Sequence, residues 1–337
     1  MSILTYQSKS KLKKILRAAL IVLGVLALLA VFRFIYLERF LVYDKDGAHL
    51  DYGAALPETE KRTDSAQKET FALIREEAAA EATPADGSPA PLSGIYVTAG
   101  QLLEPDLAPI LEAADGVNAV MLDMKTQTGK YLYTTAQAGT DTVSADLDAI
   151  GVVISALSRK PGMTLIARIP AFPDSAYALA DYSRALTIRG GALWMDQNGS
   201  YCLDPASNDV QSYLAATAEE LIRLGFDEVV FDGFAFPESG NIVYSGDRAQ
   251  VVREAAQAVA GRLSASEIPV SFVSTDPEVY RFSHRMWIPE AAGELVSEQV
   301  RQYSEVVPDP GRLVFLTGSR DTRFASYSVM SPYLPAE

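Results

Sequence analysis

The chain has 337 residues, of which 48% are hydrophobic and 21% charged, the composition of a globular protein with a real core. Its net charge of -14, with no lysine or arginine cluster after residue 39, excludes nucleic acid as a partner. The single cysteine, Cys202, excludes an intrachain disulfide and a thiolate metal cluster, and is best interpreted as a small buried hydrophobic residue. Two histidines, His49 and His284, are too few for a histidine zinc site, so we expect no metal and no cofactor. Any catalysis is expected to depend on carboxylates.

Residues 1–43 form a separate segment. Several lysines precede the uncharged run 18–32, and Arg17 and Arg33 flank it. These two side chains can reach the membrane surface, which extends the span to about 20 residues. A signal peptide and a buried helix are the alternatives, but the apolar run continues past any cleavage site of the A-x-A type. We predict an uncleaved signal anchor that crosses the cell membrane once, with a cytoplasmic N-terminus and an extracytoplasmic C-terminal domain.

Residues 44–91 have a different composition. They are rich in Ala, Glu, Thr, Ser and Pro and contain few large apolar residues. A segment of this kind cannot bury enough surface to fold alone, although residues 71–82 favour a transient helix. We predict a low-complexity linker that holds a folded domain, residues 92–337, away from the membrane.

Beyond residue 92, short apolar runs alternate with amphipathic segments. Ser144 and Asn208 are the expected N-caps of two of the helices. Strands are predicted at 94–99, 117–125, 163–172, 228–232, 268–274 and 312–317, and helices at 105–114, 144–162, 208–225, 247–263 and, more weakly, 289–303.

The strands read as continuous apolar runs, which is typical of a parallel sheet covered by helices. About 245 residues of such units fit an α/β fold of the (β/α)8 TIM-barrel type. Because only six or seven strands are convincing, we expect a barrel that is incomplete or irregular. A doubly wound open sheet is the alternative, which the absence of a G-x-G-x-x-G or Walker motif weakens.

Charged residues recur where the predicted strands end. In a parallel barrel these ends share one rim, where functional groups lie. A single aspartate after a strand is more often a cap or turn residue, but recurrence at several strands strengthens the joint case. Lys125 and Arg168 either orient a substrate or form a salt bridge across the top of the barrel. The residues expected at the rim are Asp123, Lys125, Arg168, Asp174, Asp232, Asp276 and Glu278.

The segment 191–207 combines flat aromatic side chains with short polar acceptors. Sugars are bound in this way, because the C–H face of a pyranose stacks on an aromatic ring while its hydroxyls bond to carboxylates and amides. The alternative is an ordinary loop whose tryptophan plugs the top of the barrel. Other aromatic residues, Phe172, Phe236 and Trp287, either line the same mouth or pack in the core. The sugar-binding candidates are Trp194, Asp196, Tyr201, Asp204 and Phe234.

Five segments in order carry a family resemblance: 94–100, 118–133, 165–174, 194–205 and 225–237. Together they resemble the glycosyl hydrolase domain of bacterial envelope proteins, a domain family of unknown function. The resemblance covers about residues 94–263 and implies a TIM barrel related to the α-amylase-like glycosidases.

The resemblance also implies roles for individual residues. Asp232 matches the aspartate at the end of the fourth strand and is the implied nucleophile or base. Asp123 and Arg168 match a second-strand aspartate and a third-strand arginine, and Trp194, Asp196 and Asp204 match a tryptophan–aspartate loop. The chain departs from the pattern F-D-Y-x-R-F-P in having Gly233 for the tyrosine and Ala235 for the arginine. Loss of that arginine removes a charge that would hold the carboxylate ionised.

Glycoside hydrolysis needs two carboxyl groups, about 5–5.5 Å apart for retention and about 6.5–9.5 Å apart for inversion. We expect Asp232 to be the ionised partner and Glu278 or Asp276 to be the acid with a raised pKa. The chain is therefore predicted to be a membrane-anchored glycoside hydrolase that acts on a cell-wall or environmental polysaccharide. The alternative is a degenerate barrel that binds a glycan or a protein partner without turnover. A hydrolase based on His284 lacks a G-x-S-x-G elbow.

Overall fold

The computed structural model describes residues 41–44, 47–50, 87–289, 291–319 and 321–335. The chain divides into two compact units, Met1–Leu73 and Ile74–Glu337. In the first unit, β1 (Leu41–Asp44) pairs antiparallel with β2 (Gly47–Leu50). The predicted membrane segment 18–32 and most of the predicted linker lie outside the described residues. Within the described ranges, no helix combines the length and the apolar character needed to cross a membrane.

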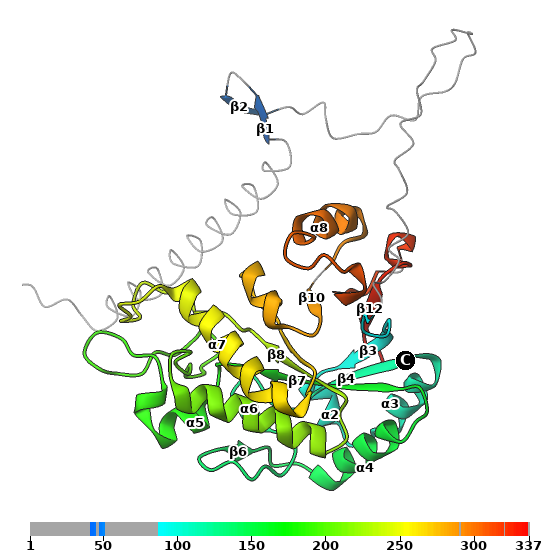
Figure 1. Cartoon of the computed structure of the whole chain (residues 1–337), viewed down its shortest axis with the longest axis horizontal. Helices are drawn as coiled ribbons and strands as arrows, with labels where there is room; N and C mark the ends of the chain where they lie inside the picture. The colour runs from blue at the N-terminus through cyan, green and yellow to red at the C-terminus, as the bar shows by residue number, and fades with distance from the viewer. Residues whose placement is uncertain (1–40, 45–46, 51–86, 290, 320, 336–337) are drawn as a thin grey trace, which may run out of the picture. The chain divides into compact units, whose positions relative to one another are not determined.

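The second unit contains eight parallel strands arranged as a nearly closed barrel (Figure 1). Neighbours in the barrel are consecutive along the chain, and the last strand pairs with the first. The fifth and sixth strands along the chain do not form a regular β-ladder. They are joined by a backbone hydrogen bond of 2.7 Å from His284 N to Val270 O. The strands are β3 (Ser93–Val97), β4 (Ala119–Asp123), β7 (Thr164–Pro170), β8 (Glu228–Asp232), β9 (Val270–Phe272), β10 (Met286–Ile288), β11 (Leu313–Leu316) and β12 (Ser328–Pro332).

The predicted TIM-type barrel is confirmed, and the open-sheet alternative is wrong because the two ends of the sheet meet. All six predicted strands form. The two that were missed, β10 and β12, lack the longer apolar run used to find the others: the three residues of β10 stand between Arg285 and Pro289, and β12 contains two serines and a proline. The barrel is thus complete in its strands.

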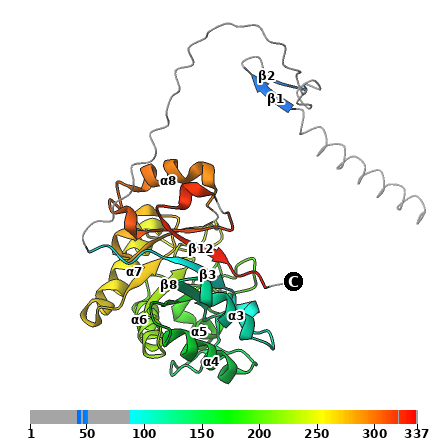
Figure 2. The same ribbon diagram turned by 90° about the vertical axis from the view of Figure 1, so that its right-hand side faces the viewer.

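The helices lie outside the strands (Figures 1 and 2). Two connections, β9 to β10 and β11 to β12, contain only single 3₁₀ segments, so the barrel is irregular in its helices. A short pair, β5 (Lys130–Tyr131) and β6 (Asp141–Thr142), lies in the β4–α4 connection. The α-helices are α2 (Ala99–Leu102), α3 (Ala108–Ala113), α4 (Leu147–Ser158), α5 (Ser175–Ala180), α6 (Asn208–Arg223), α7 (Arg248–Leu263) and α8 (Val296–Tyr303). The 3₁₀ segments are η1 (Ala114–Gly116), η2 (Tyr182–Arg184), η3 (Ser264–Ser266), η4 (Pro277–Phe282), η5 (Gly293–Leu295), η6 (Pro310–Arg312) and η7 (Thr322–Phe324).

The two predicted N-caps are wrong by one or two residues. Helix α4 is capped by Asp146, whose carboxylate accepts hydrogen bonds from the two backbone amides at positions 148 and 149. Helix α6 is capped by Ser207, whose hydroxyl accepts from Val210 N, and Asn208 is its first helical residue. Each cap is the short polar side chain that reaches the exposed amides of the first turn.

The side chains inside the barrel change from apolar to charged along the barrel axis, from the middle toward the C-terminal ends of the strands. The middle layer is apolar and includes Trp287, which is fully buried and is therefore a core residue. Because side chains alternate along a strand, residues two positions further on point the same way. Met121, Ile166 and Val230 belong to this layer, so the side chains above them at the C-terminal ends of the strands belong to Asp123, Arg168 and Asp232.

The N-terminal end of the barrel holds a buried ion pair. Glu228 accepts hydrogen bonds from Arg285 Nε at 3.0 Å and Nη2 at 2.9 Å, and His284 Nε2 lies 3.6 Å from the same carboxylate. His284 is thus at the opposite end of the barrel from Asp232. Burial alone would raise the pKa of Glu228, but contacts with His284 and Arg285 outweigh it and hold this pKa below its ordinary value of 4.5.

This ion pair should make stability depend on pH. A carboxyl with a depressed folded-state pKa binds protons more tightly when unfolded, so its stabilisation is present above pH 4.5 and is lost as pH falls through the folded pKa. We expect the free energy of unfolding, measured by urea denaturation at a series of acidic pH values, to decline less steeply in Glu228→Gln than in the parent. Glu278→Gln, which breaks an exposed and solvent-screened pair with Arg281, should change the profile much less than Glu228→Gln does. Parallel profiles for the parent and Glu228→Gln would exclude this ion pair as the source.

Candidate active site

Asp123 and Arg168 form a bidentate ion pair at the mouth of the barrel. The β4–β7 register places them opposite each other. Arg168 Nε donates to Asp123 Oδ1 at 2.6 Å and Nη2 donates to Oδ2 at 3.2 Å, while Ala99 N also donates to Oδ2. Burial alone would lower the pKa of Arg168, but contacts with Asp123 and, more weakly, Asp232 outweigh it and raise this pKa. The guanidinium therefore stays charged and is held rigidly.

Asp232 lies on the strand next to Arg168, at the end of β8. In the β7–β8 register Arg168 is opposite Val230, two residues before Asp232 on the same side of the strand. The Asp232 side chain is half-buried, and the one hydrogen bond that it makes within the described residues is accepted by Oδ1 from Gly233 N at 2.9 Å. A carboxylate oxygen is thus left for a ligand, close to a fixed cation.

Gly233 occupies a position that favours glycine. Its φ of +60° lies in the left-handed region, where a side chain is strained, although a Cβ there would meet no atom within 4 Å. The glycine in place of the tyrosine of the family pattern therefore has a backbone reason: it turns the chain directly after Asp232.

A cavity of about 420 Å³ opens beside Arg168. We call it the mouth cavity, because its walls come from the C-terminal ends of several barrel strands and the loops after them. The Tyr96 ring lies under the guanidinium, 5.4 Å from ring centroid to Arg168 Cζ. Its size is that of a small-molecule site. Its lining includes Tyr96, Arg168, Pro289, Leu316, Thr317 and Pro332.

The two predicted proton donors are engaged elsewhere. Asp276 accepts a bidentate ion pair from Arg253, at 2.6 and 3.2 Å, and caps η4. Glu278 is paired with Arg281 at 2.6 Å, and this contact lowers the pKa of Glu278. The raised pKa expected of Glu278 is therefore wrong, because the nearby charge is an arginine and the carboxyl is solvated.

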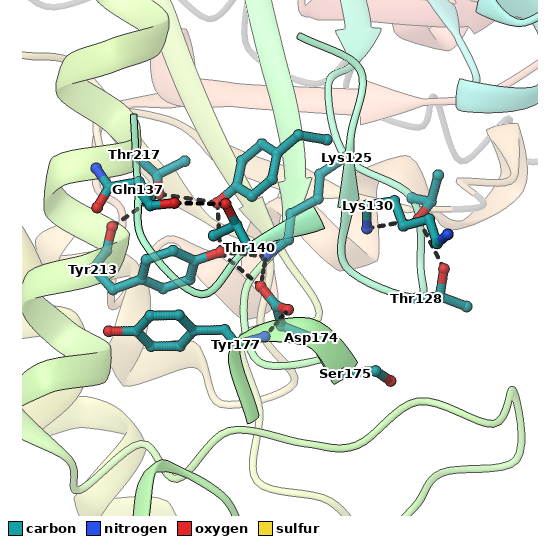
Figure 3. Close-up of polar contacts among 12 residues, drawn as sticks. Lys125, Thr128, Lys130, Gln137, Thr140, Asp174, Ser175, Tyr177, Tyr213 and Thr217 are labelled. Carbon is teal, nitrogen blue, oxygen red and sulfur yellow. Dashed lines mark hydrogen bonds and ion pairs between the residues drawn. The ribbon is translucent and has the colours of Figure 1, made fainter. Parts of the chain in front are cut away.

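Lys125 and Asp174 form a buried salt bridge (Figure 3). Lys125 Nζ lies 2.7 Å from Asp174 Oδ2, and neither side chain is exposed. Tyr213 donates its hydroxyl to Asp174 at 2.6 Å, and the Tyr131 and Tyr213 rings each lie 5.2 Å from Lys125 Nζ. Asp174 also caps α5 by accepting from Tyr177 N. The pair joins the loop after β4, the end of β7 and α6, and is not accessible to a sugar in this structure.

The aromatic loop between η2 and α6 is partly structural. The Asp196 side chain closes a turn by accepting hydrogen bonds from the backbone amides at positions 198 and 200. On either side of this turn, Met195 and Tyr201 form an isolated antiparallel β-bridge. Trp194 and Tyr201 are half-buried against the core. Asp204 accepts from Ala206 N, and burial raises its pKa.

Phe234 is a core residue, so its predicted contact with sugar is wrong. It is fully buried, and its ring centroid lies 4.5 Å from that of Phe272 and 4.7 Å from that of Phe172. Cys202 is buried as expected, and burial raises the pKa of its thiol. Within the described ranges no group of three or more His, Cys, Asp or Glu side chains is placed to hold a metal ion.

Several residues of the mouth cavity were not predicted. Tyr96 lies within an apolar predicted strand. Only the alternation of side chains along that strand could have predicted that its ring points into the barrel, beside Arg168. Thr317 ends a predicted strand as a polar residue and could have been found by the rule that found Asp232. Pro332 belongs to β12, which was itself missed.

Residues 94–307 match a family model described as "Putative glycosyl hydrolase domain". The chain belongs to this family. Asp123, Arg168 and Asp232 fall within the matched part of this glycosyl hydrolase domain, whereas Thr317 and Pro332 of the mouth cavity lie beyond it. The resemblance inferred from the sequence motifs is thereby confirmed. No match was found among curated proteins.

Several solved structures are similar to this chain at low sequence identity. A hypothetical protein from Ruminiclostridium thermocellum is 20% identical, with 56% of this chain and 99% of that chain covered and a TM-score of 0.47. Ega3 from Aspergillus fumigatus, in complex with galactosamine, is 12% identical over 74% of this chain and 95% of that chain, with a TM-score of 0.46. The GH36 α-galactosidase AgaA from Geobacillus stearothermophilus is 13% identical over 74% of this chain and 40% of that chain, with a TM-score of 0.50. The likeness to AgaA shows the barrel fold alone.

Proposed function

We propose that this glycosyl hydrolase domain cleaves a glycosidic bond at the mouth of the barrel, with Asp232 as the ionised carboxylate. The observation that carries the proposal is the placement of Asp232: it ends β8 inside the barrel mouth with one oxygen left for a ligand, next to the charged Arg168 and its cavity of about 420 Å³. In barrels of this type functional groups lie at this end. A variant of AgaA was solved with stachyose, so a barrel of this fold accommodates an oligosaccharide.

Two routes are open to Asp232. As a nucleophile it forms a bond to the anomeric carbon while the bond to the leaving oxygen breaks and that oxygen takes a proton; water then releases the sugar. As a base it removes a proton from the water that attacks the anomeric carbon directly, while the bond from that carbon to the leaving oxygen breaks and that oxygen takes a proton. In either route Arg168, held by its ion pair with Asp123, supplies a fixed positive charge near Asp232.

Hydrolysis also needs a carboxyl group that donates a proton to the leaving oxygen. Asp123, Asp276 and Glu278 each accept hydrogen bonds from an arginine. This observation favours a second candidate function, in which the barrel binds a glycan without cleaving it. A third role, binding of a protein partner, finds no specific support in the contacts described above.

The decisive experiment measures cleavage and binding side by side. The full-length chain is incubated with a panel of cell-wall and environmental polysaccharides, including peptidoglycan, chitosan, α-glucans and β-glucans, and new reducing ends are counted. Release of reducing ends from a polysaccharide supports hydrolysis. Retention on an immobilised polysaccharide without release selects the binding function, and the absence of both contradicts the two candidates together.

The same proposal places the domain outside the cell membrane, held by an anchor in residues 1–43. The support is the uncharged run 18–32 preceded by lysines. We expect a chain that begins after residue 43 to move from the membrane fraction to the soluble fraction of the producing cells, while the full chain resists extraction by high salt. If the shortened chain stays with the membrane, the anchor lies elsewhere.

A further inference from the structure

We infer that a second sugar-binding site lies on the other side of Asp232 from the mouth cavity, so that the substrate is an oligosaccharide or polysaccharide that passes over Asp232. The inference rests on the proposed function and adds a substrate class to it. The second site, which we call the side pocket, is a hollow of about 210 Å³ lined by residues that include Ala235, Phe236, Glu238, Arg248, Ser274 and Asp276.

The position of the side pocket follows from the strand order. Strand β8, which carries Asp232, lies between β7 and β9. The mouth cavity includes Arg168 from the β7 side, and its other walls come from β3, β11, β12 and the loop after β10. The side pocket is reached from the β9 side, since Ser274 and Asp276 follow that strand and Ala235 follows Asp232 by three residues. The Phe234 N to Val273 O hydrogen bond, 2.8 Å long, holds the two loops together. Asp232 thus ends the strand between Arg168 of the mouth cavity and Ser274 of the side pocket, although it lines neither hollow itself.

The side pocket presents a pre-positioned aromatic ring. Phe236 is half-buried, with the Tyr244 ring centroid 4.9 Å away and the Arg248 guanidinium 5.0 Å from its own centroid. Arg248 is fixed in turn by donating to the carbonyls of Ser239 at 2.8 Å and Ile242 at 3.3 Å. Little side-chain freedom remains to be lost when a ligand stacks there, which favours binding.

Polar groups surround this ring. The Glu238 side chain is exposed, and the hydroxyl-bearing residues Ser274 and Thr275 also line the pocket. An aromatic face with carboxylate and hydroxyl partners suits a pyranose, which has both an apolar face and a ring of hydroxyls. Glu238 and the net charge of -14 disfavour an anionic sugar, so a neutral sugar or an amino sugar is the expected occupant.

The test compares sugars of different length. Isothermal titration of full-length Asp232→Asn, in which turnover is blocked, is carried out with three pairs: glucose and maltohexaose, N-acetylglucosamine and chitohexaose, and glucosamine and chitosan hexamer. At least one hexasaccharide should bind roughly tenfold or more tightly than its monosaccharide, because it also occupies the side pocket. In the same background Phe236→Ala should remove roughly tenfold of that advantage and leave the monosaccharide affinity unchanged.

Two further variants keep the test decisive. Ala235→Trp fills the side pocket while retaining Phe236, and should have the same effect if Phe236→Ala fails to fold. Tyr182→Ala removes an aromatic side chain that is 61% exposed and lines neither hollow, and should change nothing. Equal affinities within all three pairs, or an advantage that survives both pocket variants, would overturn the second site. Length-dependent binding without turnover in the parent would instead contradict hydrolysis and leave the second site standing.

Discussion

Replacing Asp232 by asparagine is expected to slow glycan cleavage by about 10²- to 10⁴-fold. The variant keeps the shape of the side chain, and its amide oxygen can still accept the hydrogen bond from Gly233 N. It cannot take a proton from water or form a bond to the anomeric carbon. Steady-state assays of reducing ends, on the polysaccharide that the parent cleaves, should therefore show a fall in kcat with KM little changed.

A matched control separates the mouth from the aromatic loop. Asp196→Asn also exchanges an aspartate for its amide, and the new side chain can still accept from the two amides that close the turn. It should keep the parent kcat. If Asp196→Asn is as slow as Asp232→Asn, or if Asp232→Asn keeps most of the parent rate, the assignment of the ionised carboxylate to Asp232 is wrong.

Lys125→Met is expected to lower the free energy of unfolding by about 3–5 kcal/mol, because it leaves the Asp174 carboxylate buried without its cation. Burial alone would lower the pKa of Lys125, but the contact with Asp174 outweighs it and the net shift is upward. The stabilisation is thus fully present below pH 10.5, the ordinary pKa of lysine, and is lost only as pH rises through the raised folded-state pKa. Urea denaturation at neutral pH measures the whole effect.

Two variants complete this experiment. The double variant Lys125→Met/Asp174→Asn removes both charges and should be less destabilised than Lys125→Met alone. Lys130→Met, which breaks an exposed ion pair with Asp141, should change the free energy of unfolding little. A Lys125→Met variant as stable as Lys130→Met would show that the buried pair does not hold the loops together.

The strands illustrate how much of the fold is readable from the chain. Strands β4 and β8 are nearly pure apolar runs that end in an aspartate; each run predicts a buried parallel strand, and the recurrence of charged residues at several strand ends predicts a functional rim. Strand β12 has no such run, and it is recognised as a strand only by its pairing with β11 and β3. Closure of the barrel is therefore a tertiary property.

The two phenylalanines in the loop after β8 show that the sequence also does not predict which side chains are accessible at the site. Phe234 and Phe236 have the same side chain two positions apart, yet Phe234 is fully buried among core rings and Phe236 is half-buried at a pocket. The difference lies in the tertiary contacts of the two rings: Phe234 packs on Phe172 and Phe272, and Phe236 packs on Tyr244 and Arg248. Ala235 lies between them and lines the pocket, so its small size leaves room where the family pattern has an arginine.

The sequence alone determined three features: the alternation of strands and helices in a TIM-type barrel, the motifs of a glycosyl hydrolase domain, and the placement of Asp123, Arg168 and Asp232 at one rim. These features follow from local rules, namely the two-residue period of a strand and the order of parallel strands along the chain. The tertiary structure alone decided which charges are available. Lys125, Asp174, Asp276 and Glu278 occupy equally suitable positions in the chain, but each meets an oppositely charged partner. Whether two charges pair depends on the distance between segments that are far apart in the sequence. Among the described residues, Asp232 is the strand-end carboxylate that forms no salt bridge with an arginine or a lysine.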